Sequence, residues 1–152
     1  MLTIGLISDT HGLLRPQALA ALAGVDHIVH AGDIGSAAVL AGLEALAPVS
    51  AVRGNNDTGG WAECLPESAL LELAGHRLLV LHDVKTLALD PAAAHIAAVI
   101  AGHSHRPAIA ERAGVLYVNP GSAGPRRFSL PVAVGFLEID AAGLRARIQP
   151  IL

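Results

Sequence analysis

Five short apolar stretches of the chain each end in side chains that bind metal ions well. They are followed by Asp9-Thr10-His11, Gly32-Asp33, Gly54-Asn55-Asn56-Asp57, His82-Asp83 and Gly102-His103-Ser104-His105. The candidate ligands among them are seven: Asp9, His11, Asp33, Asn55, His82, His103 and His105. Seven donors are too many for one tetrahedral ion, whereas two ions that share one bridging carboxylate would use them well. The sequence therefore predicts a dinuclear metal site.

The donor atoms narrow the choice of metal. They are imidazole nitrogens and carboxylate or amide oxygens, with no thiolate among them. This set suits Mn, Fe, Zn, Ni or Co, and it is too rich in nitrogen for Ca or Mg.

The spacing of the ligands suggests how they converge. Residues two apart point to the same side of extended backbone, so Asp9 and His11 would face one metal if the strand geometry continued there. His103 and His105 have the same spacing. Neighbouring glycines would allow tight turns and close approach of the backbone; they are Gly12, Gly32, Gly54 and Gly102.

The first half of the chain alternates strand and helix patterns. Strands are predicted over 3–8, 27–31 and 49–53, and helices over 16–23 and 36–46. This βαβαβ order predicts parallel strands with right-handed crossovers. Ligands bind outside the carboxyl ends of strands in such sheets, which is where the metal-binding side chains fall.

The second half reads mainly as hairpins. Three pairs of strands are predicted, over 69–73 with 77–81, 108–112 with 115–118, and 133–139 with 144–149. A further strand is predicted over 98–101, and a short helix over 90–95 with Asp90 as its cap and Pro91 at its first position. We expect an α/β protein with mixed sheets, in one domain that spans residues 1–152.

Composition excludes several classes of protein. Of the 152 residues 53% are hydrophobic and 15% charged, which is unlike a disordered chain. The net charge of −3 argues against a nucleic-acid scaffold. One cysteine, Cys64, rules out an internal disulfide, and the N-terminus has neither a leader pattern nor a membrane-length apolar run. We expect a cytoplasmic protein that acts on a small molecule, with no membrane and no nucleic acid among its partners.

The ordered series of motifs resembles the calcineurin-like metallophosphoesterase superfamily. Asn119-Pro120-Gly121-Ser122, followed by Pro125-Arg126, resembles its small YfcE-type phosphodiesterase branch. The resemblance implies a four-layer α-β-β-α sandwich with two mixed β-sheets. It also implies that relatives often form homo-oligomers, so self-association is a further expectation.

The same resemblance divides the ligands between two ions. Asp9, His11 and His105 would hold the first, Asn55, His82 and His103 the second, and Asp33 would bridge them. The implied activity is a dinuclear metal-dependent phosphoesterase, with a phosphodiesterase favoured, in which a metal-bridging hydroxide attacks the phosphate ester. Manganese is the favoured metal, with zinc, iron or nickel as alternatives.

Two positions depart from the pattern of the superfamily. Asn56 stands where many relatives have a histidine that binds phosphate or protonates the leaving group, and an amide cannot act as that acid. Asp83 stands where relatives usually have glycine, and its charge would either tighten a metal or repel an anionic substrate. Asn56 and Asp57 are the candidate catalytic residues, and Asn56 and Arg126 the candidate substrate-binding residues.

Each of these residues has a plainer interpretation. Asp57 fits a turn after Asn55-Asn56 as well as a carboxylate that supports the ligands, and Arg126 fits a surface charge. His30 fits core packing, or the orientation of a ligand. Trp61 is assigned to an interface between copies, in preference to the pocket rim.

Two other functions compete with the enzyme. One is a catalytically silent metal-binding protein-interaction module on the same fold, for which a eukaryotic retromer subunit is a precedent. The other is a metal-stabilised structural domain with closed coordination.

Overall fold

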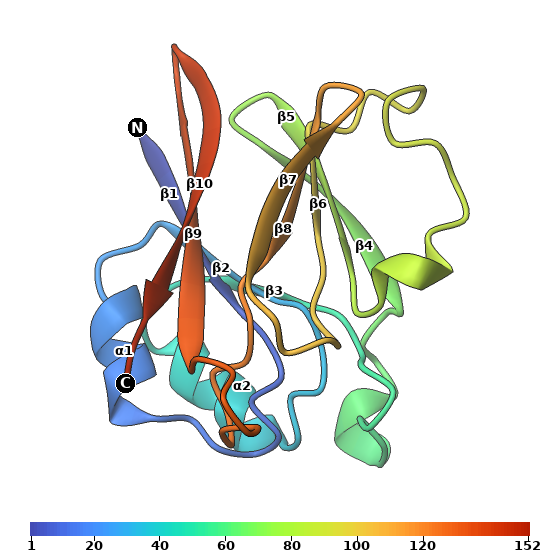
Figure 1. Cartoon of the computed structure of the whole chain (residues 1–152). Helices are drawn as coiled ribbons and strands as arrows, with labels where there is room; N and C mark the ends of the chain where they lie inside the picture. Colours follow the sequence, from blue (N-terminus) through green and yellow to red (C-terminus); the bar gives the residue numbers. More distant parts are fainter.

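The first sheet is built on the βαβαβ segment that the sequence predicts. In the computed structural model, which describes residues 1–152, β1 (Leu2–Ile7), β2 (His27–His30) and β3 (Val49–Ala51) are parallel. They are connected by helices α1 (Pro16–Leu22) and α2 (Ala37–Glu44). The antiparallel hairpin of β9 (Ala133–Asp140) and β10 (Gly143–Pro150) extends the sheet beside β1 (Figure 1), giving the order β10-β9-β1-β2-β3.

The second sheet has the order β4-β5-β6-β8-β7. Its centre is parallel and consists of β5 (His76–Leu81), β6 (Ala98–Ile100) and β8 (Val115–Asn119). Its antiparallel edges are β4 (Ser68–Leu73) and β7 (Ala108–Arg112), which the predicted hairpins supply. Short 3-10 helices, η1 (Gly60–Ala62) and η2 (Val84–Thr86), lie in the connections.

Alternation along the strands places apolar side chains between the layers. On β1, Ile4 and Leu6 face the second sheet and pack with Leu78, Ile100 and other buried residues of β5 and β6. Ile7 belongs instead to the cluster with α1 and α2, which cover the outer face of the first sheet (Figure 1). The mixed α/β sandwich expected from the sequence is therefore confirmed.

The fourth layer differs from the sequence prediction in one element. The expected helix over 90–95 is absent, and residues 91–95 form turns. Asp90 does accept hydrogen bonds from the Ala92 and Ala93 amides, at 3.1 and 3.4 Å, as a cap would. The turn cannot propagate because His95 has a left-handed φ of 58° and Ile96 enters a third apolar cluster against the second sheet. Neither α-helix, at seven and eight residues, has the length needed to cross a membrane.

Candidate metal centre

All seven predicted ligands lie in loops that follow the carboxyl ends of parallel strands. Asp9 and His11 follow β1, Asp33 follows β2, and Asn55 follows β3. The remaining three come from the second sheet: His82 follows β5, and His103 and His105 follow β6. Because the two sheets lie face to face, their parallel strand ends open on the same side and bring the loops together.

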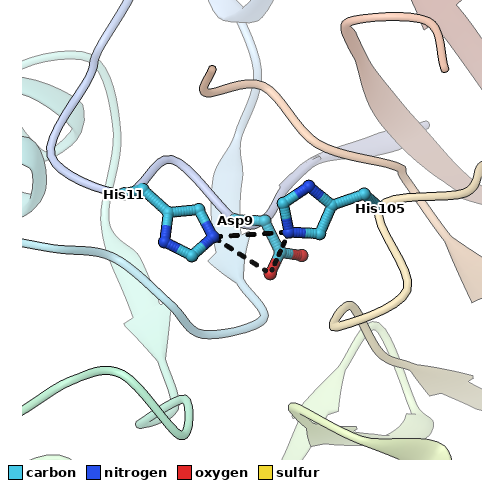
Figure 2. A group of neighbouring side chains, drawn as sticks. All are labelled: Asp9, His11 and His105. Atoms are coloured by element: carbon cyan, nitrogen blue, oxygen red, sulfur yellow. Dashed lines mark hydrogen bonds and ion pairs between the residues drawn. The ribbon is translucent and has the colours of Figure 1, made fainter. Parts of the chain in front are cut away.

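Asp9, His11 and His105 form the first group (Figure 2). The Nε2 atoms of His11 and His105 are 3.3 Å apart. Asp9 Oδ1 lies 3.9 Å from His11 Nε2 and 3.4 Å from His105 Nε2. Figure 2 shows both imidazoles directed toward this one carboxylate oxygen.

Asp33, His82 and His103 form the second group, with Asn55 beside them. His82 Nε2 lies 3.2 Å from Asp33 Oδ2 and 3.3 Å from His103 Nδ1. Asn55 Oδ1 is 3.2 Å from the same His103 nitrogen. Asp33 Oδ2 is also 3.7 Å from His11 Nε2, so this carboxylate lies between the two groups, where a bridging ligand would be needed.

The ligands reach the centre through turns, and the expectation that extended strand geometry continues there is wrong. β1 ends at Ile7, and Asp9 and His11 adopt left-handed φ angles of 54° and 47°. Asp33, His103 and His105 are also left-handed. Such conformations cost energy for residues other than glycine, and they concentrate at functional sites where the surroundings enforce them.

Hydrogen bonds hold the ligand side chains in place. Asp9 Oδ2 accepts from the Ser8 hydroxyl at 2.7 Å and from the His103 amide at 3.0 Å. The Nδ1–H of His82 donates a hydrogen bond to the Ala31 carbonyl at 2.8 Å. This leaves the lone pair of His82 Nε2 to bind a metal.

His30 makes hydrogen bonds to the ligand loops, which favours a role in orienting the ligands over plain core packing. It is fully buried, and its Nδ1 accepts from the Gly32 amide at 3.1 Å. The Nε2 therefore carries the proton and donates to the Thr10 hydroxyl at 3.0 Å, which in turn donates to the Ile34 carbonyl at 2.8 Å. The network joins the loop of Asp9 and His11 to the loop of Asp33.

Burial and local charge set the protonation of the centre. Burial by itself would raise the pKa of Asp33, but hydrogen bonds from His82 and the Asn56 amide outweigh it and lower this pKa to about 2. Burial raises the pKa of Asp9, although the Ser8 hydrogen bond opposes it. Burial lowers the pKa of His30 to about 3, so its imidazole is neutral in the fold.

The residues present fit divalent metal ions. Asp9 Oδ1 is buried without any hydrogen-bond partner, which is costly unless a cation compensates it. Donors about 2.1 Å from a shared ion are roughly 3–3.4 Å apart when adjacent, and the closest donor pairs of each group have this separation. Nitrogen and oxygen donors suit a first-row transition metal.

The candidate catalytic residues act mainly on the ligands. The Asn56 backbone amide donates to Asp33 Oδ1 at 2.9 Å, and its side-chain amide donates to Asp33 Oδ2 at 3.1 Å. Asp57 accepts hydrogen bonds from the backbone amides of Ile34, Gly35 and Gly54. The bond from Gly54 closes the local turn, and the bonds from Ile34 and Gly35 tie this turn to the loop of Asp33, as expected of a carboxylate that supports the ligands.

Two charged residues near the centre also take definite places. Asp83 faces the centre: its Oδ2 is 3.9 Å from His103 Nε2, and its Oδ1 accepts from the Lys85 amide at 3.0 Å. Arg126 is exposed and makes no hydrogen bond or ion pair, which agrees with the surface interpretation. The neighbouring Arg127 is the one whose charge reaches the centre, because it adds to burial in lowering the pKa of His105.

A polar cleft of about 270 Å³ opens beside the second group. Ligands Asn55, His82 and His103 line it together with Asp83, and no hydrophobic residue does. Arg53 and Glu67, 3.2 Å apart, form another part of its wall. Sequence reasoning missed Arg53, although it ends the third predicted strand directly before Gly54-Asn55. Trp61 is not part of this wall; it is partly buried and packs against the apolar cluster that contains Ile7 and the helices, and its role at an interface between copies stays a prediction.

Comparison with known proteins places the chain in a family. The Calcineurin-like phosphoesterase superfamily domain matches residues 2–142. A probable metallophosphoesterase of Methanothermobacter thermautotrophicus is 37% identical, over 95% of this chain and 90% of its own length. A second probable metallophosphoesterase, from Methanocaldococcus jannaschii, is 34% identical over 97% of this chain and 81% of its own length. The chain belongs to the calcineurin-like phosphoesterase superfamily, and the predicted membership is confirmed.

Solved structures show the same fold in proteins of different use. A novel archaeal phosphodiesterase matches with a TM-score of 0.80 at 24% identity, covering 97% of this chain and all of that one. Vacuolar Protein Sorting 29 from Cryptosporidium parvum matches with a TM-score of 0.77 at 16% identity. The match covers 97% of this chain and 96% of that one. At these identities the likeness establishes the fold alone.

Proposed function

We propose that the protein is a phosphodiesterase that uses two divalent metal ions, with manganese as the favoured metal. The observation that carries the proposal is the position of Asp33 Oδ2, 3.2 Å from His82 Nε2 and 3.7 Å from His11 Nε2, between two groups of donors. Asp9, His11 and His105 would hold one ion, Asn55, His82 and His103 the other, and Asp33 would bridge them. Two such ions supply an acidified water as the nucleophile and offset the charge that develops on phosphate.

The chain's own residues bind and position the other parts of the reaction. Arg53 faces the polar cleft and is the cation best placed to bind a phosphate oxygen, in preference to Arg126. Asn56 holds both oxygens of Asp33 and fixes the bridging carboxylate. A cleft without apolar walls fits polar, hydroxyl-bearing ester groups, which supports a small and hydrophilic substrate. A cytoplasmic location stays a prediction from the sequence.

Removal and return of metal tests the proposal. Protein stripped with a chelator should lose hydrolysis of bis-p-nitrophenyl phosphate and regain it with Mn²⁺. Asp33→Asn should lower turnover by roughly 10²-fold or more, because the preorganised charge that binds both ions is lost. Glu63→Gln, at an exposed acid outside the centre, is the matched control and should retain turnover.

The competing function gives a different result. The similarity to Vacuolar Protein Sorting 29 makes a protein-interaction module the alternative. Protein that binds two ions per chain, yet hydrolyses neither the diester nor p-nitrophenyl phosphate with any first-row metal, would contradict the enzyme and favour the module.

A further inference from the structure

The outer face of the second sheet is only partly covered. Leu79, Leu81 and Val99, on β5 and β6, pack with Ile96 and Leu87 of the connection between these two strands. This connection, yellow-green in Figure 1, runs beside the second sheet. Over β6, β8 and β7 a hollow of about 210 Å³ remains. It is distinct from the polar cleft of the metal centre, with which it shares no lining residue.

Small side chains create the hollow. Ala108 and Ala110 alternate along β7 so that both face it, and Ala101 of the β6 end adds a third short side chain. Tyr117 and Val99 contribute larger side chains to the lining. The lining is therefore mainly apolar, as ligand pockets commonly are.

The charge of the hollow has one sign. Arg106 and Arg112 line it, no acidic residue does, and neither guanidinium forms an ion pair. The Arg112 guanidinium lies over the Tyr117 ring, 5.1 Å from its centroid, which holds the cation at the wall. In a chain of net charge −3, two unpaired arginines at an apolar hollow are a local positive site.

We propose that this hollow binds a small organic anion, which has an aromatic or branched apolar body and one carboxylate, sulfonate or phosphate group. The body would fill the space above Ala108 and Ala110, and the anionic group would pair with Arg112, which lies at one end of β7 beside Tyr117. Arginine is suited to this pairing because its planar guanidinium both stacks and donates two parallel hydrogen bonds. The site does not depend on the metal ligands, so its occupation is separate from hydrolysis.

Titration with 8-anilinonaphthalene-1-sulfonate tests the site, because the dye is an anion with an aromatic body and contains no phosphate ester. Wild-type protein should bind one dye molecule per chain with a saturable rise in fluorescence, in metal-free and metal-loaded protein alike. Arg112→Gln should weaken binding by roughly tenfold, since a charge-assisted hydrogen bond is lost. Arg145→Gln, which removes an exposed arginine of β10, should change the dye affinity less than about twofold.

Shape and charge are tested separately. Ala110→Trp should fill the hollow and abolish binding, whereas Ala142→Trp, in the exposed β9–β10 turn, should not. Naphthoate should compete with the dye roughly tenfold better than the neutral naphthamide. Circular dichroism checks that each variant is folded. If Ala110→Trp does not fold, the comparison of Arg112→Gln with the wild type still tests the proposal.

Three outcomes would overturn the proposal. They are non-saturable dye binding, equal affinity of Arg112→Gln and Arg145→Gln, or a wild-type dimer that Ala110→Trp dissociates without any dye binding. The last would assign this face to self-association. None of them depends on phosphoesterase activity, because Asp33→Asn should bind the dye as wild type does.

Discussion

At the scale of single residues, Asn56 is the point where the chemistry of this protein departs from that expected of its relatives. Its two amides hold Asp33, and neither can protonate a departing alkoxide. General acid catalysis contributes on the order of 10²–10⁴-fold when a group with a suitable pKa is present. Esters with good leaving groups should therefore react well here and poor ones slowly.

Replacing Asn56 with histidine tests this argument. Asn56→His should raise kcat for alkyl phosphodiesters more than for p-nitrophenyl diesters, by roughly tenfold or more in the ratio. The dependence of log kcat on the leaving-group pKa, measured over a series of aryl and alkyl esters, should flatten. Asn56→Gln keeps an amide and is the control. A uniform change across the series would mean that Asn56 serves only to hold Asp33.

The convergence of the seven candidate ligands could be predicted because each comes shortly after an apolar run. To predict that they come together, it is enough to know that the carboxyl ends of parallel strands meet at one edge of a sheet. The residues that support them could not be found in this way. Ser122 donates to the Asp9 carbonyl from 113 positions away, and Asn119 donates to Gly102 and Ser104 across the second sheet. Such contacts depend on which strands become neighbours and on how the sheets pack, which no local pattern contains.

At the scale of elements, the strand order was predictable and the conformation of the loops was not. Apolar alternation and the β-branched runs gave the first three parallel strands, all three hairpins and both α-helices within a few residues. The ligands' left-handed backbone had no signature in the sequence, because non-glycine residues adopt it only when tertiary contacts enforce it. The prediction of a helix over 90–95 was wrong for a related reason, because the chain must turn there to bring Ile96 into an apolar cluster against the second sheet.

The loop of His103 and His105 depends on a close approach at Gly102. A Cβ there would lie 2.0 Å from Ser8 Oγ and 2.6 Å from Asp9 Oδ2. Gly102→Ala should therefore displace Asp9 from the His103 amide and weaken metal binding by roughly 10–100-fold, as loss of a ligand's supporting hydrogen bond does. Calorimetric titration with Mn²⁺ measures this.

Gly60→Ala is the matched control for the loop. A Cβ at Gly60 meets nothing within 4 Å, and its φ is not left-handed. This variant should bind Mn²⁺ as the wild type does. Equal affinities in the two variants would show that the close approach at Gly102 relaxes without moving the ligands.

At the scale of the whole molecule, the centre lies where two sheets meet, so the protonation of a buried group there affects the entire fold. His30 is buried on β2 and spans the two loops that carry Asp9, His11 and Asp33. Its pKa is lowered to about 3 in the fold by burial, whereas in the unfolded chain it is near 6.5. Unfolded chains therefore bind a proton between these pH values and folded chains do not.

The stability of metal-free protein should fall as the pH falls below about 6.5, and His30 should contribute to that slope. One group accounts for up to about 1.4 kcal/mol per pH unit, or roughly 1–3 kcal/mol between pH 7 and pH 4.5. His30→Gln has an amide that can still donate to Thr10 but does not titrate. Urea unfolding in the presence of a chelator should therefore show a shallower loss of stability in this variant over that range, even if its stability at pH 7 is lower. Parallel curves for the two proteins would mean that His30 becomes protonated in the fold without cost, and that the hydrogen bond from the Gly32 amide to its Nδ1 is not needed to hold the two ligand loops together.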